Sequence, residues 1–182
     1  MNELMTGKGA LCEYTSGCPP PAAYAPIIPP LKSDARPLYV AQHTMSTAAE
    51  AARVEFVKDH IDFGIDEPGH AHACVPIFGI DCPGTDKKRV LFDDSTNNSI
   101  NMETIGIRLP TSVDWVKFLQ GAKLLTSVDL ASFFTAIRLH QDYRDFWTFL
   151  GRKVGPLRTT RLVQGNSESP AIAQAFIGAT LV

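Results

Sequence analysis

The sequence predicts an α+β fold, in which short strands and helices are interleaved along the chain. Two segments, near residues 47–63 and 111–120, carry helix-capping residues followed by apolar residues at helical spacing. Between and after them, short apolar runs bounded by Gly, Pro or Asp are typical of strands. The chain has 182 residues, 45% of them hydrophobic, which is enough for one globular domain with a core.

The first 36 residues differ in composition from the rest and are expected to form a flexible leader. The run from Cys18 to Pro21, and then Pro26, Pro29 and Pro30, favours extended polyproline conformation and blocks helix formation. The sequence has no apolar run approaching the ~18 to 20 residues that span a bilayer. It has no signal-peptide pattern at its start either. We therefore expect a cytosolic or nuclear protein without a membrane anchor.

In the first half of the chain, a helix is predicted to start at the capping box formed by Thr47 and Glu50, and to stop at Gly64. Residues 73–80 are predicted to form an edge strand, because Pro76 cannot donate a ladder hydrogen bond. A turn at 82–86 then leads to a strand at 88–92. These two strands are expected to form a hairpin.

In the second half, a helix is predicted to start at Thr111 or Ser112 and to end at Gly121. Residues 124–130 are predicted to be a buried strand, followed by short strands at 136–139, 146–149 and 158–163. The last element is expected to be a helix from about Pro170, with Ser169 as its N-cap.

Charge is distributed unevenly between the two halves. Residues 1–86 hold five Lys or Arg and eleven Asp or Glu, whereas residues 87–182 hold twelve and eight. The basic half is the half that carries the polar motifs, as a site for phosphates requires. Ordinary solvated surface explains the same distribution, so charge alone does not decide between the two.

Asp129 follows the apolar run 124–128 and precedes a turn with two aromatic residues. A carboxylate at the end of a buried strand is costly unless it binds a cation or a hydrogen-bond donor. Two interpretations are open: Asp129 binds a metal ion, or its oxygen accepts backbone N–H bonds of the following turn.

Three short segments, in a fixed order along the chain, resemble motifs of a known family. They are Arg-Val-Leu-Phe-Asp-Asp at 89–94, Val-Asp-Leu-Ala-Ser-Phe-Phe at 128–134, and Val-Gln-Gly-Asn-Ser-Glu-Ser-Pro at 163–170. From about Arg36 to the C-terminus, the chain resembles the reverse transcriptases of retroviruses and of gypsy-type LTR retrotransposons. The resemblance implies polymerase fingers and the first part of the palm in residues 37–182, with a mixed or antiparallel sheet and packing helices.

The resemblance implies RNA-directed DNA synthesis, in which a primer 3′ hydroxyl attacks a dNTP with the help of two Mg²⁺ ions. Asp129 looks like the first metal-binding aspartate, and the carbonyl of Leu130 would be a further ligand of the nucleotide-bound Mg²⁺. The partners implied are template RNA or DNA, primer, dNTP and the remainder of a polyprotein.

Further nucleotide-binding roles follow from the same resemblance. Phe134 matches an aromatic steric gate that excludes a 2′ hydroxyl, although a plain core phenylalanine is the alternative. Arg89 resembles the arginine that holds the triphosphate with two hydrogen bonds, and Lys88 or Lys87 is a candidate for the neighbouring phosphate-binding lysine. An exposed basic turn is the competing interpretation of all three.

Gln164 and Gly165 resemble the motif that supports the nucleotide sugar and the template base. Glycine there permits a positive φ or a close backbone approach. Without the family, the pair is an ordinary strand-to-helix turn. Asp93 resembles a structural aspartate of the fingers, but its usual arginine partner is Ser95 in this chain.

One departure from the family is large, because the sequence has no Asp-Asp hairpin after the helix that begins near Pro170. We therefore expect no polymerase activity from these 182 residues alone. A non-catalytic retroelement remnant that binds nucleic acid is the alternative function. The family's palm sheet is also cut before its central hairpin, which predicts an exposed apolar face and poor solubility.

A small zinc-binding interaction module is a lesser alternative. His70, His72 and Cys74 alternate and would share one face of a strand, with Cys82 across the predicted turn. Together with Cys12 and Cys18, these cysteines match no CxxC pair, and free thiols are expected in a reducing compartment.

Overall fold

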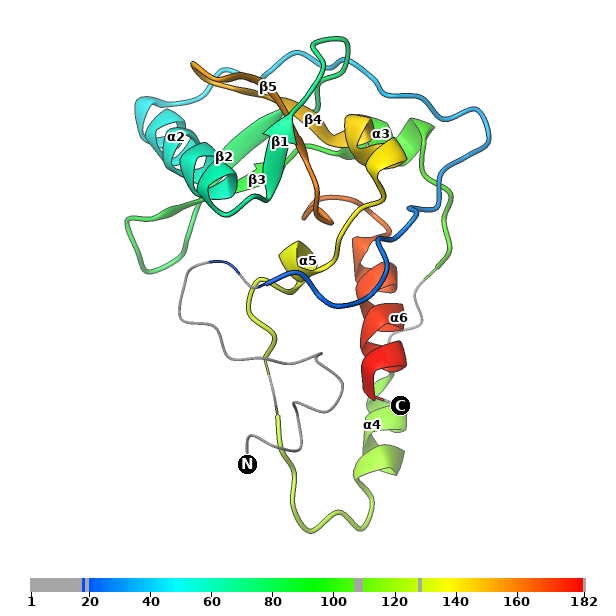
Figure 1. Cartoon of the computed structure of the whole chain (residues 1–182). Coiled ribbons are helices and arrows are strands. Elements are labelled where there is room, and N and C mark those ends of the chain that lie inside the picture. The colour runs from blue at the N-terminus through cyan, green and yellow to red at the C-terminus, as the bar shows by residue number, and fades with distance from the viewer. Residues whose placement is uncertain (1–17, 19, 107–109, 128, 182) are drawn as a thin grey trace.

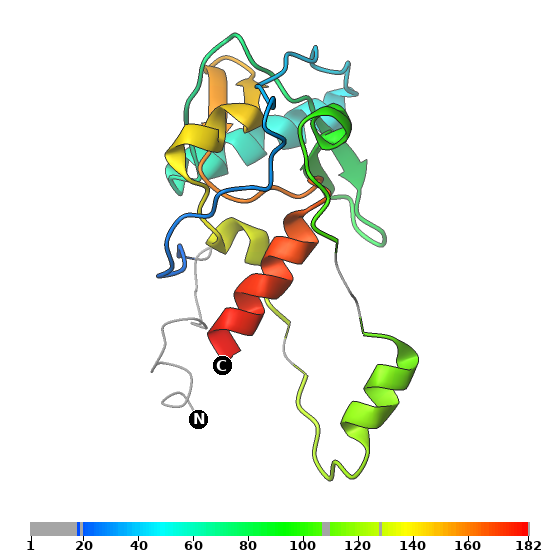
Figure 2. The same ribbon diagram turned by 90° about the vertical axis from the view of Figure 1, so that its right-hand side faces the viewer.

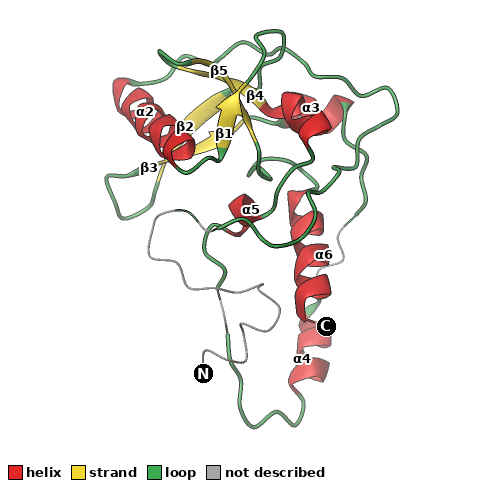
Figure 3. Ribbon diagram, in the orientation of Figure 1, coloured by secondary structure: helices red, strands yellow, loops and turns green. Residues whose placement is uncertain are grey.

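The computed structural model describes residues 18, 20–106, 110–127 and 129–181. Its described part is an α+β fold with two small antiparallel sheets (Figures 1 and 3). One sheet has the order β1-β5-β4, formed by Asp66–Pro68, Gly155–Thr159 and Thr148–Gly151, and the other is the hairpin of β2 (Ile77–Asp81) and β3 (Lys88–Phe92).

Helix α2 (Thr47–Asp62) forms where the sequence predicted a helix, and it packs against β2 and β3. Its N-cap is Ser46, one residue before the predicted capping box, because the Ser46 hydroxyl accepts a hydrogen bond from the N–H of Ala49 at 3.2 Å. Gly64 follows the helix with φ +64°, which confirms the predicted stop.

The predicted hairpin is confirmed, with Ile77 opposite Phe92 and Asp81 opposite Lys88. Its first strand begins at Ile77 and not at residue 73. Pro76 has no N–H, and the N–H of Val75 donates to the carbonyl of Thr148 instead, so residues 73–76 connect the two sheets.

The second half differs more from the prediction. Residues 136–139 are not a strand: helix α5 (Phe133–Ala136) is followed only by isolated bridges at Arg138 and Leu139. The 3₁₀ helix η1 (Gln141–Trp147) replaces the start of the strand predicted at 146–149. The strand predicted at 158–163 lies earlier, as β5.

Helix α4 (Ser112–Leu119) is confirmed, with a complete capping box between Thr111 and Asp114. It extends away from the body of the molecule (Figure 2), and the apolar side chains Trp115 and Phe118 are 52% and 77% exposed. The predicted strand at 124–130 is wrong: its described residues form no strand, and Leu124 is 92% exposed. A strand needs a hydrogen-bonded neighbour, and no described segment pairs with these residues.

The short helix α3 (Ser95–Ile100) follows β3 directly, and helix α6 (Ser169–Leu181) ends the described chain. In α6 the hydroxyl of Ser169 donates to the carbonyl of Val163 at 2.7 Å, which ties the start of the helix to the loop before it. The core lies between the sheets and the helices. Its largest fully buried apolar side chains are Trp147, Phe149, Ile77, Ile137 and Leu139.

Residues 20–36 lie against this core, whereas the sequence predicted a flexible leader over residues 1–36. The N–H of Ile27 donates to the carbonyl of Arg138, and its carbonyl accepts from the N–H of His140, both at 2.8 Å. The N–H of Lys32 donates to the carbonyl of Asn101. The segment is extended, as its prolines require, but it is bonded to the body. None of the described helices combines the length and apolar character needed to cross a membrane.

Candidate functional site

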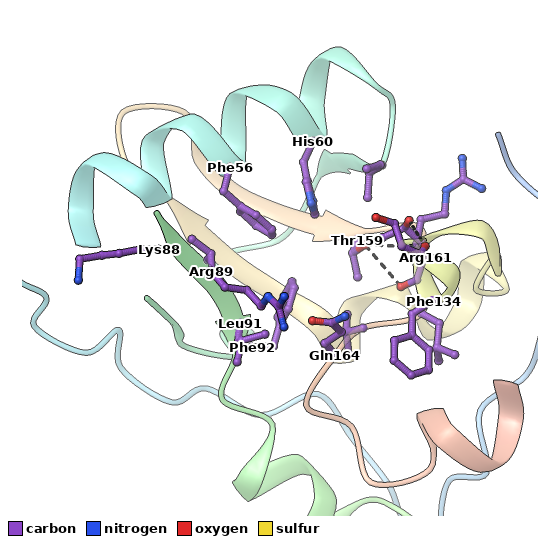
Figure 4. Close-up of a pocket in the computed structure, with 16 residues that line it drawn as sticks. Phe56, His60, Lys88, Arg89, Leu91, Phe92, Phe134, Thr159, Arg161 and Gln164 are labelled. Carbon is purple, nitrogen blue, oxygen red and sulfur yellow. Dashed lines mark hydrogen bonds between the residues drawn. The ribbon is translucent and has the colours of Figure 1, made fainter. Parts of the chain in front are cut away.

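A cleft of about 440 Å³ opens between α2, β3, α5 and the segment that follows β5 (Figure 4). This volume lies in the range of small-molecule sites. Four residues that the sequence predicted for nucleotide binding line the cleft: Lys88, Arg89, Phe134 and Gln164. They come from three separate parts of the chain, which only the fold brings together.

The lining of the cleft is cationic. Lys88, Arg89 and Arg161 contribute the positive charge, the imidazole of His60 lies beside them, and no Asp or Glu is among the described residues that line the cleft. Arg161 is 8% exposed, and its Nε and Nη1 atoms have no hydrogen-bond partner among the described residues. Burial lowers the pKa of Arg161, because the buried cation loses its hydration. A cleft with this lining favours an anionic ligand.

Arg89 and Lys88 are neighbours on β3, so their side chains leave the strand on opposite sides. The ammonium group of Lys88 pairs with Asp81 across the hairpin. In Figure 4 Lys88 points away from Gln164, whereas Arg89 points toward it. Arg89 is therefore the better placed of the two for a ligand. Lys87 is exposed in the hairpin turn and does not line the cleft.

Phe134 is the second residue of helix α5. The helix follows Ser132, which has a left-handed backbone conformation with φ +48°. The ring of Phe134 lines the cleft and also packs against the hydrophobic core. The ring thus has the core contacts of a plain core phenylalanine and also faces the cleft, and its role as a steric gate stays a prediction. Phe133 instead packs edge-on against Phe176 of α6, with ring centroids 5.9 Å apart.

Gln164 and Gly165 form the turn between β5 and α6. Gln164 is exposed on the cleft and points toward Arg89 (Figure 4). Gly165 has φ +112°, and a Cβ there would lie 2.5 Å from the carbonyl oxygen of Phe92. Its own carbonyl accepts a hydrogen bond from Asn98 Nδ2 at 2.8 Å. Only glycine fits this close approach of the two segments, as the sequence predicted.

Replacing Gly165 by Ala is expected to destabilise the fold by more than about 2 kcal/mol, because the new Cβ clashes with the backbone of β3 at a positive φ. Gly178→Ala is the matched control, since it lies in α6 with open space around its Cβ, and it should stabilise the chain by about 0.5 to 1 kcal/mol. Urea denaturation measures both changes. Equal effects of the two substitutions would contradict the assigned contact.

A buried polar network at Asp94 holds the cleft segments together, and sequence reasoning missed it. Asp94 is 1% exposed, and its Oδ2 accepts hydrogen bonds from Trp147 Nε1 at 3.1 Å and Asn166 Nδ2 at 2.9 Å. Its Oδ1 accepts from Asn97 Nδ2 at 3.1 Å. One carboxylate, directly after β3, thus connects α3, the end of η1 and the loop that carries Gln164. The signal available in the sequence was the polar run at residues 93–98, which directly follows the strand at 88–92.

Burial raises the pKa of Asp94 to about 6, and the bonds from Trp147, Asn166 and Asn97 oppose that rise. The folded state therefore binds this proton more tightly than the unfolded chain does. The resulting stabilisation is complete below about pH 4 and is lost as pH rises through about 6.

The titration of Asp94 alone is expected to make the free energy of unfolding about 1 kcal/mol higher at pH 5 than at pH 7.5. The measurement is urea denaturation at both pH values for the wild-type chain and for Asp94→Asn, which lacks the titrating group. The difference between their pH dependences isolates Asp94. Identical pH dependences would show that this carboxyl does not titrate in the window.

Asp129 and Leu130 do not line the cleft. Asp129 is exposed and Leu130 is half-buried, so the carboxylate is not turned into an apolar interior. The structure gives no strand end there, because the strand predicted at 124–130 is absent from the described chain. No group of three His, Cys, Asp or Glu side chains that could hold a metal occurs among the described residues. The arrangement therefore does not fit a two-Mg²⁺ centre.

Asp93 has local partners instead of an arginine. Its Oδ1 accepts a hydrogen bond from the Ser95 hydroxyl, and its Oδ2 lies 2.8 Å from His43 Nε2. The bond from Ser95 and that from His43 lower the pKa of Asp93. This carboxylate fastens residues 37–46 to the end of β3, which is a structural role.

The zinc interpretation finds no support. His70 and His72 stack with ring centroids 5.6 Å apart, but Cys74 is fully buried, and Cys82 lies beyond the far end of β2. These four residues are all described, and they form no metal-binding group. Cys18, Cys74 and Cys82 form no disulfide with one another, as expected, and Cys12 lies outside the described residues.

Comparison with known proteins indicates the class of polyprotein that the chain resembles. No family model matches the sequence. The chain is similar to a region of retroviral Gag-Pol polyproteins, which supports an origin in a retroelement polyprotein. The similarity covers 81% of this chain and 9% of each relative, so the chain spans about a tenth of the length of the curated relatives it matches.

Three of these relatives come from retroviruses. The Gag-Pol polyprotein of Koala retrovirus is 29% identical to this chain over 153 residues. Those of Gibbon ape leukemia virus and Feline leukemia virus are each 27% identical, over 153 and 154 residues.

Proposed function

We propose that the chain is the fingers and the first part of the palm of an RNA-directed DNA polymerase, and that its cleft binds the incoming deoxynucleoside triphosphate. The single observation that carries this proposal is the convergence of Arg89, Phe134 and Gln164 on one cationic cleft. Each was selected from sequence alone, by position within a motif. The similarity to Gag-Pol polyproteins supports the same retroelement origin.

Each of the three residues has a role that its chemistry suits. The guanidinium of Arg89 donates two parallel hydrogen bonds to phosphate oxygens. The amide of Gln164, on the opposite wall, donates to and accepts from the sugar or the base. The ring of Phe134 provides an apolar surface beneath the sugar, where a 2′ hydroxyl has no room. The cationic lining attracts the triphosphate before these contacts form.

The role of Asp129 as a metal ligand belongs to this proposal, with the Leu130 carbonyl beside it. Asp129 is exposed but is not among the residues that line the cleft, so a nucleotide in the cleft does not by itself bring its Mg²⁺ to this carboxylate. The described residues supply no group of carboxylates for two ions, so we derive no catalytic step from this chain. The same observation favours the alternative function, a non-catalytic remnant that binds nucleic acid.

The experiment that tests the proposal compares dCTP with CTP, which differ by one 2′ hydroxyl. We expect the wild-type chain to bind dCTP about tenfold more tightly in isothermal titration calorimetry with MgCl₂, and Phe134→Val to remove most of that preference. Phe133→Val is the matched control, since its ring packs on α6, and it should keep the preference. Binding of oligonucleotides without binding of either nucleotide would favour the non-catalytic remnant.

A further inference from the structure

His60 and Asp66 form a hydrogen-bonded pair at the edge of the cleft. His60 lies in the last turn of α2, and its Nδ1 is 2.9 Å from Oδ2 of Asp66 in β1. The Asp66 side chain is fully buried, and its Oδ1 has no hydrogen-bond partner among the described residues. His60 is thus the one hydrogen-bond partner described for a buried carboxylate, which fixes the orientation of the ring.

A second contact holds the imidazole from the other side. The ring of Phe56, one helical turn earlier, lies with its centroid 3.7 Å from that of His60. Both rings line the cleft, and the His60 side chain is 15% exposed. Because Nδ1 is taken by Asp66, only Nε2 of His60 is left for a ligand.

His60 lines the same cleft as the residues assigned to the nucleotide. In Figure 4 it points from α2 down into the cleft, above Gln164, and Arg89 reaches toward Gln164 from the β3 side. A nucleotide with its sugar at Phe134 and Gln164 and a phosphate on Arg89 would occupy the cleft that His60 also lines, which leaves His60 as a partner for an outer phosphate. The charged side chains that line the cleft are Lys88, Arg89 and Arg161, of which Lys88 points away toward Asp81, and Asp66 is bonded to the imidazole.

We propose that His60 is a phosphate-binding residue that acts as an imidazolium in the complex: its Nδ1–H donates to Asp66, which positions the ring, and its Nε2–H donates to an outer phosphate oxygen of the bound triphosphate. The inference rests on the proposed function for the identity of the nucleotide. The chemistry that recognises the ligand is that of a polyphosphate anion, so free tripolyphosphate should bind the same residue.

Two substitutions of His60 separate a ligand contact from a structural role. In His60→Asn, the amide nitrogen lies near the position of Nδ1, so the bond to Asp66 is kept and the group facing the cleft is lost. In His60→Gln, the amide nitrogen lies near the position of Nε2, so the donor to the cleft is kept. A purely structural role predicts that the Asn variant behaves as the wild type and that the Gln variant is impaired.

Calorimetric titration with dTTP, dTMP and tripolyphosphate tests the proposal. We expect His60→Asn to weaken binding of dTTP and of tripolyphosphate about tenfold and to leave dTMP unchanged, with His60→Gln within about threefold of the wild type. Thermal denaturation checks that each variant folds. If the Gln variant does not fold, the Asn variant alone still decides, since wild-type affinity for dTTP and tripolyphosphate would overturn the proposal.

Arg89→Ala distinguishes failure of the two proposals. If it weakens dTTP binding and His60→Asn does not, the phosphate role of His60 is wrong and the nucleotide cleft stands. If tripolyphosphate binds in a His60-dependent manner and dTTP binds no better than tripolyphosphate, the nucleotide assignment fails and the phosphate site stands. If the wild-type chain binds neither probe, both proposals are wrong.

Discussion

Arg89→Ala is expected to lower the affinity of the chain for dTTP about 10- to 100-fold. The guanidinium is the best-placed cation of the cleft, and a charge-assisted hydrogen bond to phosphate contributes about 1.5 to 3 kcal/mol. Arg89 is exposed on β3, so its removal should leave stability almost unchanged. Arg89→Lys should recover only part of the affinity, because a lysine cannot donate two parallel bonds. Isothermal titration calorimetry at fixed salt measures each constant.

Arg152→Ala is the matched control for charge. Arg152 lies in the turn between β4 and β5, pairs with Glu50, and is not among the residues that line the cleft. The Arg152→Ala substitution removes the same formal charge as Arg89→Ala but leaves the cleft intact, so it should change dTTP affinity by less than about twofold. Equal losses for the two substitutions would mean that net charge, and not the cleft, binds the nucleotide.

Asp94→Ala is expected to have the largest effect on stability, a loss of about 3 to 5 kcal/mol. The substitution removes the carboxylate whose two oxygens accept hydrogen bonds from three buried donors: Trp147 Nε1, Asn166 Nδ2 and Asn97 Nδ2. Those donors would be left without a partner in the interior. Because Asn166 belongs to the loop that carries Gln164, the cleft should lose its geometry with the fold. Urea denaturation followed by tryptophan fluorescence measures the loss.

The adjacent carboxylate provides the control. Asp93 is about one-third exposed and contacts Ser95 and His43 at the surface. Asp93→Ala should cost about 1 kcal/mol or less. A loss at Asp94 no larger than the loss at Asp93 would contradict the role of the buried network.

Elements with strong local signals could be predicted from the sequence. Helix α4 begins at Ser112, one of the two predicted start residues, and the β2–β3 hairpin forms across the predicted turn. Gly64 ends α2 where expected. In each case residues within one turn of the element determine the outcome, so no distant contact is needed to predict it.

Elements that depend on distant partners could not be predicted. The apolar run at 124–130 suits a buried strand, but a strand needs a neighbour, and apolar character does not reveal whether one is present. Residues 20–36 have the composition of a flexible segment, yet backbone bonds from Ile27 and Lys32 fasten them to residues more than sixty positions away. Composition alone does not indicate such bonds.

The candidate site divides in the same way. Arg89, Phe134 and Gln164 were identified from motifs, and the fold brings them to one cleft. Their geometry depends on Asp94, which is bonded to residues far along the chain, and the partner of His60 is a buried aspartate on another element. Neither pairing has a spacing that a sequence pattern could reveal. Asp129, chosen from the same kind of motif, lies outside the cleft lining.

The most direct test of the central claim is a map of where dTTP binds. In NMR titration of the ¹⁵N-labelled chain, the amides of residues 88–92, 132–135 and 159–165 should shift with one common saturation curve. The amides of α4, which lies away from the cleft, should not move. Absence of saturable shifts, or shifts that gather on α4 and not around Arg89 and Gln164, would contradict the assignment of the cleft as a nucleotide site.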